Sequence, residues 1–307
     1  MSLLVIGTVA LDALETPFGK TDKIVGGSCS YAALAASYFY DKVNIVAVVG
    51  GDFPKEFIKT LNDHGVSTEG LQIKETEKSF FWSGKYHNDM NSRDTLITEL
   101  NVLANFDPVI PESYQDCKYL MLGNLSPSVQ TAVINRLRKR PKLIAMDTMN
   151  FWMDVAYDDL MQTLSLVDVL TINDEEARQL SKEYSLVKAA KKILTMGPKY
   201  LIIKKGEHGA LLFNKDHVFF APALPLEEVF DPTGAGDTFA GGFIGYIASK
   251  DDTSFDTMKA AIINGSALAS FCVEKFGTER ILNLNEHDIE ERIQEFIELV
   301  QFEIKLH

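Results

Sequence analysis

The sequence predicts an α/β protein whose mainly parallel sheet is covered by helices on both faces. Short runs rich in Val, Ile and Leu alternate along most of the chain with longer segments in which apolar residues recur every three or four positions. This alternation is typical of such a sheet. The 307 residues are 46% hydrophobic and 24% charged, so they can bury a large core. No internal repeat or linker is visible, which predicts one domain over residues 1–307.

The elements of this sheet can be followed along the chain. The predicted strands are short, apolar and often β-branched, and they cover residues 3–11, 43–49, 119–122, 142–146, 167–172 and 200–204. The predicted helices cover residues 53–64, 129–138, 174–182 and 187–196. A last amphipathic helix, to which we assign only a structural role, has one apolar face made of Ile289, Ile293, Phe296, Ile297 and Val300.

Two segments interrupt the alternation and predict a second, smaller sheet. Residues 16–25 and 71–102 have a partly alternating pattern, and the second segment is rich in aromatic residues, namely Phe80, Phe81, Trp82 and Tyr86. We expect antiparallel strands that stand off the main domain as a lid, within residues 13–25 and 71–104. An extension of the edge of the main sheet is the alternative that this pattern leaves open.

Charge and cysteine content exclude several classes of partner. The formal net charge of −13, from 30 Lys and Arg against 43 Asp and Glu, repels nucleic acid and anionic membrane surfaces. The apolar run at residues 3–11 lacks a preceding basic region and is far shorter than the roughly 20 residues of a membrane span. Three widely spaced cysteines, Cys29, Cys117 and Cys272, fit a reducing compartment and show no zinc-ligand spacing with the histidines. We therefore expect a cytoplasmic protein.

The strongest motif is the segment DPTGAGDTFAGGF at residues 231–243. Gly234, Ala235 and Gly236 leave almost no side chain, so a ligand can approach the backbone closely. The apolar run after them predicts a helix, whose first N–H groups and positive dipole end favour an anion. Asp237 then lies in the first turn, beside this anion site. An Asp that only caps the helix is the alternative, but it would not explain the neighbouring glycines.

This segment resembles the second signature of the ribokinase-like (PfkB) carbohydrate kinase family. Four further motifs of that family precede this segment in the right order: Gly26-Gly27, Gly50-Gly51-Asp52, Asn173-x-x-Glu176 and Lys205-Gly206-x-x-Gly209. The resemblance spans nearly the whole chain. It implies a three-layer α/β/α ribokinase-like core with a β-sheet lid, through which some members form homodimers. It also implies ATP-dependent phosphorylation of a hydroxyl of a small sugar or sugar-like molecule.

The resemblance further implies a role for each motif residue in phosphoryl transfer. Asp237 would be the general base, and the N–H groups of Gly234, Ala235 and Gly236 would hold the γ-phosphoryl oxygens. Glu176, and less directly Asn173, would place hydrated Mg²⁺ at the ATP phosphates. The nucleotide would be bordered by Lys205, Gly206 and Gly209. The alternatives are a solvated acidic helix start for Glu176 and a simple hairpin turn for the two glycines.

Substrate and cation sites are implied in the same way. Asp12, directly after the predicted first strand, would accept hydrogen bonds from two adjacent hydroxyls, and the substrate would approach the backbone at Gly26, Gly27 and Ser28. A plain turn is the alternative for these glycines. A monovalent cation such as K⁺ would bind near Asp231 and Thr233, with carbonyl groups from Cys272, Lys275 and Gly277 as further ligands.

Departures from the family pattern leave the substrate open. Tyr31 stands where many sugar kinases have Asn, and residues 147–152 lack the arginine of the more usual Asp-x-Asn-x-Arg. The aromatic residues of the lid keep a nucleoside as the alternative to a sugar, although lid packing explains them equally well. A non-catalytic nucleotide sensor is disfavoured because Asp237 is present. A Rossmann dehydrogenase is excluded because Gly7 lacks the partners of Gly-x-Gly-x-x-Gly.

Overall fold

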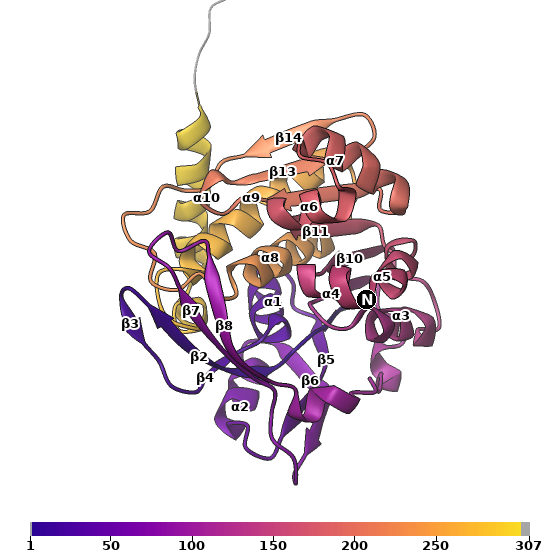
Figure 1. The fold of residues 1–307 in the computed structure, drawn as a ribbon, viewed down its shortest axis with the longest axis vertical. Helices are drawn as coiled ribbons and strands as arrows, with labels where there is room; N and C mark the ends of the chain where they lie inside the picture. The colour runs from indigo at the N-terminus through magenta and orange to yellow at the C-terminus, as the bar shows by residue number, and fades with distance from the viewer. Residues whose placement is uncertain (1, 302–307) are drawn as a thin grey trace, which may run out of the picture.

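The computed structural model describes residues 2–301 and contains one large and one small sheet in that range (Figure 1). The large sheet follows the order β14 (Val218–Ala221), β13 (Ala210–Phe213), β12 (Tyr200–Lys204), β11 (Val169–Asn173), β10 (Leu143–Asp147), β9 (Tyr119–Leu122), β1 (Leu3–Ile6), β5 (Val43–Gly50), β6 (Val66–Lys74). The seven neighbouring strands β12, β11, β10, β9, β1, β5 and β6 pair in parallel. Only β13 and β14 add antiparallel pairs. The predicted α/β class is confirmed.

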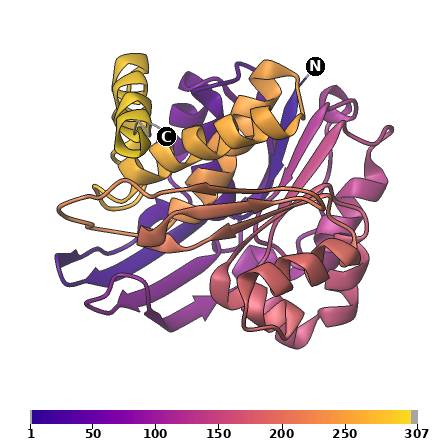
Figure 2. The same ribbon diagram turned by 90° about the horizontal axis from the view of Figure 1, so that it is seen from above.

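Helices cover both faces of the large sheet, as Figure 2 shows from above. One face packs against α1 (Ser28–Ser37), α2 (Lys55–Asp63), α8 (Ala235–Lys250) and α9 (Phe255–Cys272). The other packs against α3 (Pro127–Arg136), α4 (Asn150–Val155), α5 (Tyr157–Leu164), α6 (Asp174–Ser181) and α7 (Leu186–Ile193). Strand alternation divides the two cores: Leu3 of β1 faces the first and Leu4 faces the second.

The last helix, α10 (Glu286–Val300), lies outside α9. Ile289 and Phe296 are buried there, but Ile297 and Val300 are about half exposed. The predicted apolar face is therefore wrong for its last part, because α10 packs against the rest of the protein along one narrow line only. None of the helices within residues 2–301 is long and apolar enough to span a membrane.

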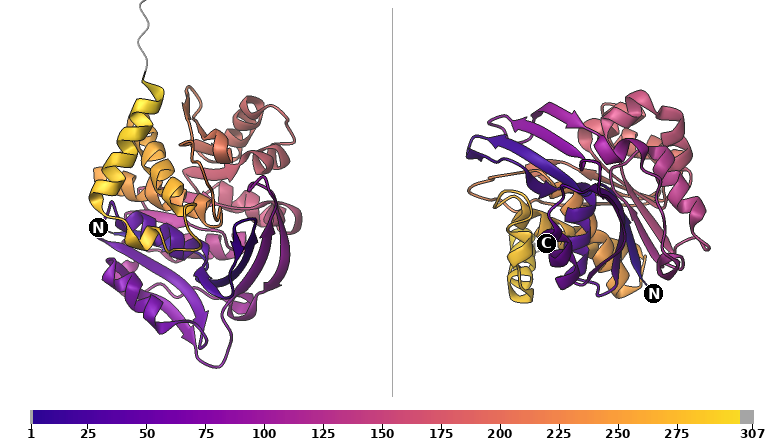
Figure 3. Two further views of the ribbon diagram at one scale, coloured as in Figure 1. Left: turned by 90° about the vertical axis from the view of Figure 1, so that its left-hand side faces the viewer. Right: turned by 90° about the horizontal axis from the view of Figure 1, so that it is seen from below.

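The small sheet stands to one side of the large one (Figure 3). Its strands are β3 (Gly19–Lys20), β2 (Ala10–Thr16), β7 (Phe81–Tyr86) and β8 (Arg93–Glu99) in that order, with β4 (Ile24–Gly26) also paired to β2. The expectation of antiparallel pairing is wrong for β2 and β7, which are parallel. The chain crosses α1, β5, α2 and β6 between these two strands, and such a long connection permits parallel pairing.

Two predicted boundaries also need correction. Residues 71–74 belong to β6, which pairs with β5 at the edge of the large sheet, so they are not part of the small one. The predicted strand at residues 3–11 is two strands, because β1 ends at Ile6 and β2 begins at Ala10. Between them the backbone N–H of Thr8 donates to Ser28 Oγ over 3.1 Å, and the N–H of Ser28 donates to Thr8 Oγ1 over 2.9 Å. Asp12 therefore lies inside β2 of the small sheet.

Candidate active site

The start of α8 brings the Gly-Ala-Gly motif against α1. Gly234 precedes the helix with a φ of 76°, which favours glycine, and a Cβ added there would lie 2.4 Å from the ring of Tyr31. The glycines after Asp237 have a different purpose: a Cβ on Gly241 would lie 2.1 Å from the carbonyl oxygen of Ala32 in α1. These later glycines allow two helix backbones to pack closely, which the sequence alone did not reveal.

Asp237 lies in the first turn of α8, whose N-cap is Gly234, so the alternative of a simple capping Asp is wrong. Burial and, to a lesser extent, the charge of the nearby Asp147 raise the pKa of Asp237 to about 7, against the opposing effects of Lys204 and Arg93. A carboxyl group with a pKa near neutrality can accept a proton and release it at physiological pH. The side chain therefore suits a general base beside the anion site.

Asp12 lies close to Asp237, although Asp12 belongs to the small sheet and Asp237 to helix α8, which packs on the large sheet. Asp12 is only 5% exposed. Burial and then the charges of Asp231 and Asp237 raise its pKa to about 7, against the opposing effect of the N–H of Gly27. A Cβ on Gly26 would lie 1.8 Å from Asp12 Oδ2, so only glycine allows this approach. The predicted substrate residues thus meet at one place, although Ser28 is engaged by Thr8.

One face of the small sheet continues from Asp12. Trp82 is the register neighbour of Asp12, and Gly84 and Tyr86 follow on the same face of β7 because side chains alternate along a strand. The Trp82 ring covers Gly84, where an added Cβ would lie 2.1 Å from the indole, and its Nε1 donates to Thr95 Oγ1 over 3.3 Å. Phe81 points to the opposite face. Of the predicted aromatic residues, Trp82 and Tyr86 therefore share the face of Asp12.

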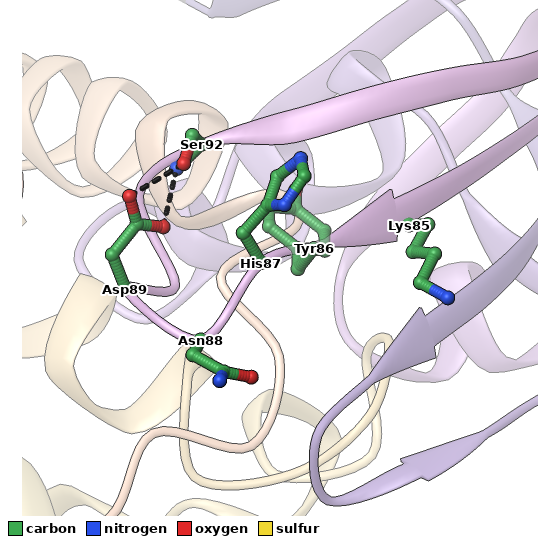
Figure 4. A pocket seen from close by; sticks show the side chains of 6 residues that line it. All are labelled: Lys85, Tyr86, His87, Asn88, Asp89 and Ser92. Carbon is green, nitrogen blue, oxygen red and sulfur yellow. Dashed lines mark hydrogen bonds between the residues drawn. The ribbon is translucent and has the colours of Figure 1, made fainter.

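The β7–β8 hairpin contacts the main domain on both sides of the anion site. Thr233 Oγ1 donates to the hydroxyl of Tyr86 over 3.1 Å. At the tip of the hairpin, a Cβ on Gly206 would lie 2.6 Å from Asn91 Oδ1. Figure 4 shows the side chains around this turn, where an open pocket of about 560 Å³ is lined by Lys85, Tyr86, His87, Asn88, Asp89 and Ser92. The small sheet therefore extends from the substrate residues to the predicted nucleotide border.

Asn173 and Glu176 form a reciprocal capping box at the start of α6. The N–H of Glu176 donates to Asn173 Oδ1, and the N–H of Asn173 donates to Glu176 Oε2, each over 2.8 Å. Glu176 is 8% exposed, so a solvated acidic face is the wrong interpretation. Burial and then the charge of Asp147 raise its pKa to about 7, against the opposing effects of Lys204, the N–H of Asn173 and Arg93. A carboxylate held in this way has oxygen ligands suited to Mg²⁺.

The Lys-Gly-x-x-Gly motif forms the turn between β12 and β13. Gly206 and Gly209 have φ values of 53° and 81°, and the N–H of Lys205 donates to the carbonyl oxygen of Gly209 over 2.8 Å. The hairpin interpretation is therefore confirmed. It is compatible with a border of a nucleotide site.

The predicted cation residues gather behind the anion site. Asp231 is fully buried, and its two oxygens accept from the N–H groups of Thr233 and Gly277 over 2.8 and 2.9 Å. Cys272 Sγ lies 3.6 Å from the carbonyl oxygen of Thr233. The ammonium group of Lys275 lies 5.7 Å from the centroid of the Phe230 ring, which leaves its carbonyl group as the predicted ligand.

Three residues near this site were missed as candidates: Asp147, Lys204 and Arg93. Asp147 and Lys204 are the last residues of β10 and β12, and ligands commonly bind at the carboxyl ends of parallel strands. That position was a signal the sequence did offer. Arg93 begins β8, and nothing in its local pattern distinguishes it from an exposed strand residue.

Comparison with known proteins supports one family. The family described as "pfkB family carbohydrate kinase" matches residues 5–284. A cytidine kinase of Thermococcus kodakarensis is 34% identical over 248 residues, covering 80% of this chain and 87% of that protein. A ribokinase of Haemophilus influenzae is 27% identical, with 90% of each chain covered. A structure from E. coli described as a ribokinase II with ATP and Mg²⁺ is 20% identical, with a TM-score of 0.77, covering 95% of this chain and 99% of that one.

Proposed function

The chain belongs to the pfkB family of carbohydrate kinases, and we propose that its phosphoryl acceptor is a nucleoside. It is an ATP-dependent phosphotransferase that acts on a hydroxyl of a small sugar or sugar-like molecule. The observation that carries the finer proposal is the position of Trp82, beside Asp12 on one face of the small sheet. A nucleoside offers its flat base for stacking on an indole, and a free sugar lacks this contact.

In this proposal Asp12 accepts hydrogen bonds from the 2′- and 3′-hydroxyls, which are the only adjacent pair in a ribonucleoside. Charge-assisted bonds of this kind contribute roughly 1.5–3 kcal/mol each. The primary 5′-hydroxyl is then the group left for Asp237, which takes its proton as the hydroxyl attacks the phosphoryl group. The N–H groups of Gly234, Ala235 and Gly236 stabilise the developing negative charge.

Two ions are part of the proposal. Glu176, with Asn173 fixing it, is buried beside Asp147 and offers oxygen ligands, which suits a hydrated Mg²⁺ at the phosphates. Such an ion neutralises phosphate charge during transfer. A monovalent cation such as K⁺ is proposed near Asp231 and Thr233. The buried hydroxyl of nearby Tyr31 has no hydrogen-bond partner within residues 2–301, which supports a polar occupant in this region.

We also propose that the small sheet acts as a lid and that two copies of the chain associate through it. Strand β8 is at the outer edge of the small sheet, where an unpaired strand can add to another. It is exposed throughout, and its Leu96 and Ile97 are 54% and 47% exposed. Replacement of Ile97 by Lys should convert a dimer to a monomer in light scattering. A wild-type monomer at all concentrations tested would contradict the dimer.

The substrate proposal is tested by phosphoryl transfer from ATP and Mg²⁺ to cytidine, uridine, adenosine, inosine and free ribose. We expect at least one nucleoside to have a kcat/KM far above that of ribose, and its 2′-, 3′- and 5′-deoxy analogues to be poor acceptors. If ribose is as good as every nucleoside, the acceptor is a free sugar. If a 2′- or 3′-deoxy analogue is as good as its parent, Asp12 is not the diol acceptor.

The stacking claim is separable. Trp82→Ala should lower kcat/KM for the nucleoside by about 5- to 150-fold relative to ribose, as loss of roughly 1–3 kcal/mol of stacking implies. Phe81→Leu is the matched control, since it removes an aromatic ring from the opposite face of the same strand. Its nucleoside-to-ribose ratio should equal that of the wild type. Equal losses for both acceptors in Trp82→Ala would show that the indole only holds the small sheet together.

A further inference from the structure

Three neighbouring strands of the large sheet end in polar residues at the same edge. Asp147 ends β10, Asn173 ends β11 and Lys204 ends β12, and Asn173 and Lys204 are register partners. Asn173 is explained by the capping box of α6. Asp147 and Lys204 have no such local explanation, and both lie where ligands of parallel sheets commonly bind.

The two side chains form a nearly buried ion pair. Lys204 Nζ lies 2.6 Å from Asp147 Oδ2, and the side chains are 19% and 9% exposed. The hydroxyl of Thr171 donates to the same oxygen over 3.0 Å, which fixes the carboxylate. Removing two charges from water is costly, so such a pair is weak evidence of a purely stabilising role. A function for the charges explains it better.

The ammonium group of Lys204 points at the anion site. A Cβ added to Gly236 would lie 3.1 Å from Lys204 Nζ, so the group lies directly against the second residue of α8. A cation is normally unfavourable at the positive end of a helix, where anions are preferred. Lys204 is also electrostatically coupled to Glu176 and Asp237, in addition to Asp147. An anion bound at the N–H groups of this turn would make the arrangement favourable.

We propose that Lys204 contacts the transferred phosphoryl group and that Asp147 is a positioning residue for its ammonium group. The lysine supplies a fixed positive charge where negative charge develops on the phosphoryl oxygens, in addition to the N–H groups of the Gly-Ala-Gly turn. The chain lacks the arginine of the usual Asp-x-Asn-x-Arg pattern at residues 147–152, so Lys204 is the positive charge that this site offers beside Asp147. The proposal rests on the phosphotransfer activity and is independent of which acceptor is used.

The chain offers a matched control for Lys204. Lys199 precedes the other end of β12 and pairs with Asp168, a buried carboxylate, over 2.9 Å. Its side chain is 73% exposed, far from the start of α8 along the strand. Lys199→Met therefore removes the same charge and a similar ion pair without touching the site.

The experiment compares Lys204→Met, Lys204→Arg and Lys199→Met. Two rates are measured for each variant: kcat with the wild type's best acceptor, and slow ATP hydrolysis without acceptor. The third measurement is inhibition by ADP with aluminium fluoride, which mimics the transferred phosphoryl group. Lys204→Met should lower both rates by about 10²–10³-fold, as loss of one transition-state donor does. It should also abolish the inhibition while ADP affinity stays within error of the wild type. The melting temperature should fall, because Asp147 is left buried without its partner. Lys204→Arg should restore part of the rate, and Lys199→Met should match the wild type throughout.

Asp147→Asn tests the positioning role. We expect a kcat about tenfold lower with an unchanged KM for ATP, and the double variant with Lys204→Met should be no slower than Lys204→Met alone. The proposal is overturned if Lys204→Met turns over within about threefold of the wild type, or if its loss of activity follows an equal loss of ADP affinity. Additive losses in the double variant would show that Asp147 does not act through Lys204 and would remove its positioning role. Because ATP hydrolysis needs no acceptor, these outcomes are separate from a failure of the nucleoside proposal.

Discussion

Replacing Asp12 by Asn should stabilise the protein at alkaline pH even though it harms substrate binding. Asn keeps the shape of the side chain and an oxygen for the N–H of Gly27, but it cannot ionise. The pKa of Asp12 is raised from 3.8 to about 7 by burial and by Asp231 and Asp237. Because the folded-state pKa is the higher one, the contribution of the protonated carboxyl to stability is complete below about pH 4 and is lost as the pH rises through about 7.

The magnitude follows from this shift. Each pKa unit corresponds to about 1.4 kcal/mol, so ionised Asp12 costs the folded state up to about 4 kcal/mol at pH 8. We expect urea unfolding to show a free energy of unfolding for Asp12→Asn that exceeds the wild-type value increasingly between pH 4 and pH 7, and by a constant amount above. In the same preparation, kcat/KM for the acceptor should fall while the KM for ATP stays nearly unchanged.

The control is Asp22→Asn, which removes an exposed carboxylate from the loop before β4. Its difference from the wild type should stay small across the same pH range, since exposed carboxylates are not desolvated by folding. A difference between Asp12→Asn and the wild type that does not change between pH 4 and pH 8 would refute the reasoning. So would a variant that is less stable than the wild type at pH 8.

Three further predictions concern the catalytic steps. Asp237→Asn should lower kcat by at least about 10²-fold with ATP binding intact in calorimetry, and near-normal turnover of this variant would remove Asp237 from the mechanism. The kcat/KM of the wild type should fall as the pH drops through about 7, where Asp237 becomes protonated. Glu176→Gln should raise the Mg²⁺ concentration needed for half-maximal rate, and an unchanged requirement would return this residue to a purely capping role. Arg93→Gln should move the acidic limb of the pH–rate profile to higher pH, because Arg93 lowers the pKa of Asp237, and a shift to lower pH or none would contradict that coupling.

Features encoded by neighbouring residues could be predicted from the sequence. The Gly-Ala-Gly turn with Asp237, the Asn173–Glu176 capping box and the glycine hairpin at 206–209 each depend on the conformations of a few consecutive residues. The alternation of short apolar runs with helical segments likewise predicted the large sheet, because strands buried on both faces are continuously apolar. Even here the start of α3 was placed too late, because Pro127 suits the first helical position.

Features that depend on pairing between distant segments could not be predicted in this way. The break between β1 and β2 is stabilised by Thr8 and Ser28, twenty residues apart, so the run at residues 3–11 looked like one strand. Which aromatic residue lies beside Asp12 depends on the parallel register of β2 with β7, and the local pattern gives no register. The pair of Lys204 with Asp147 joins strands that are neighbours in the sheet order only through β11.

Three buried carboxyl groups lie near one another at the junction of the two sheets. Asp12, Glu176 and Asp237 all have pKa values near 7, so at neutral pH each is partly protonated and none carries its full desolvation cost. Ionising all of them at once would cost an amount comparable with the whole stability of a domain, roughly 5–15 kcal/mol. Lys204 alone cannot balance them, because its single positive charge is shared among Asp147, Glu176 and Asp237. In the proposed mechanism, divalent cations that arrive with the phosphate donor, and hydroxyl donors that arrive with the acceptor, favour the ionised forms, so that the substrates bring the carboxylates into the state that catalysis needs.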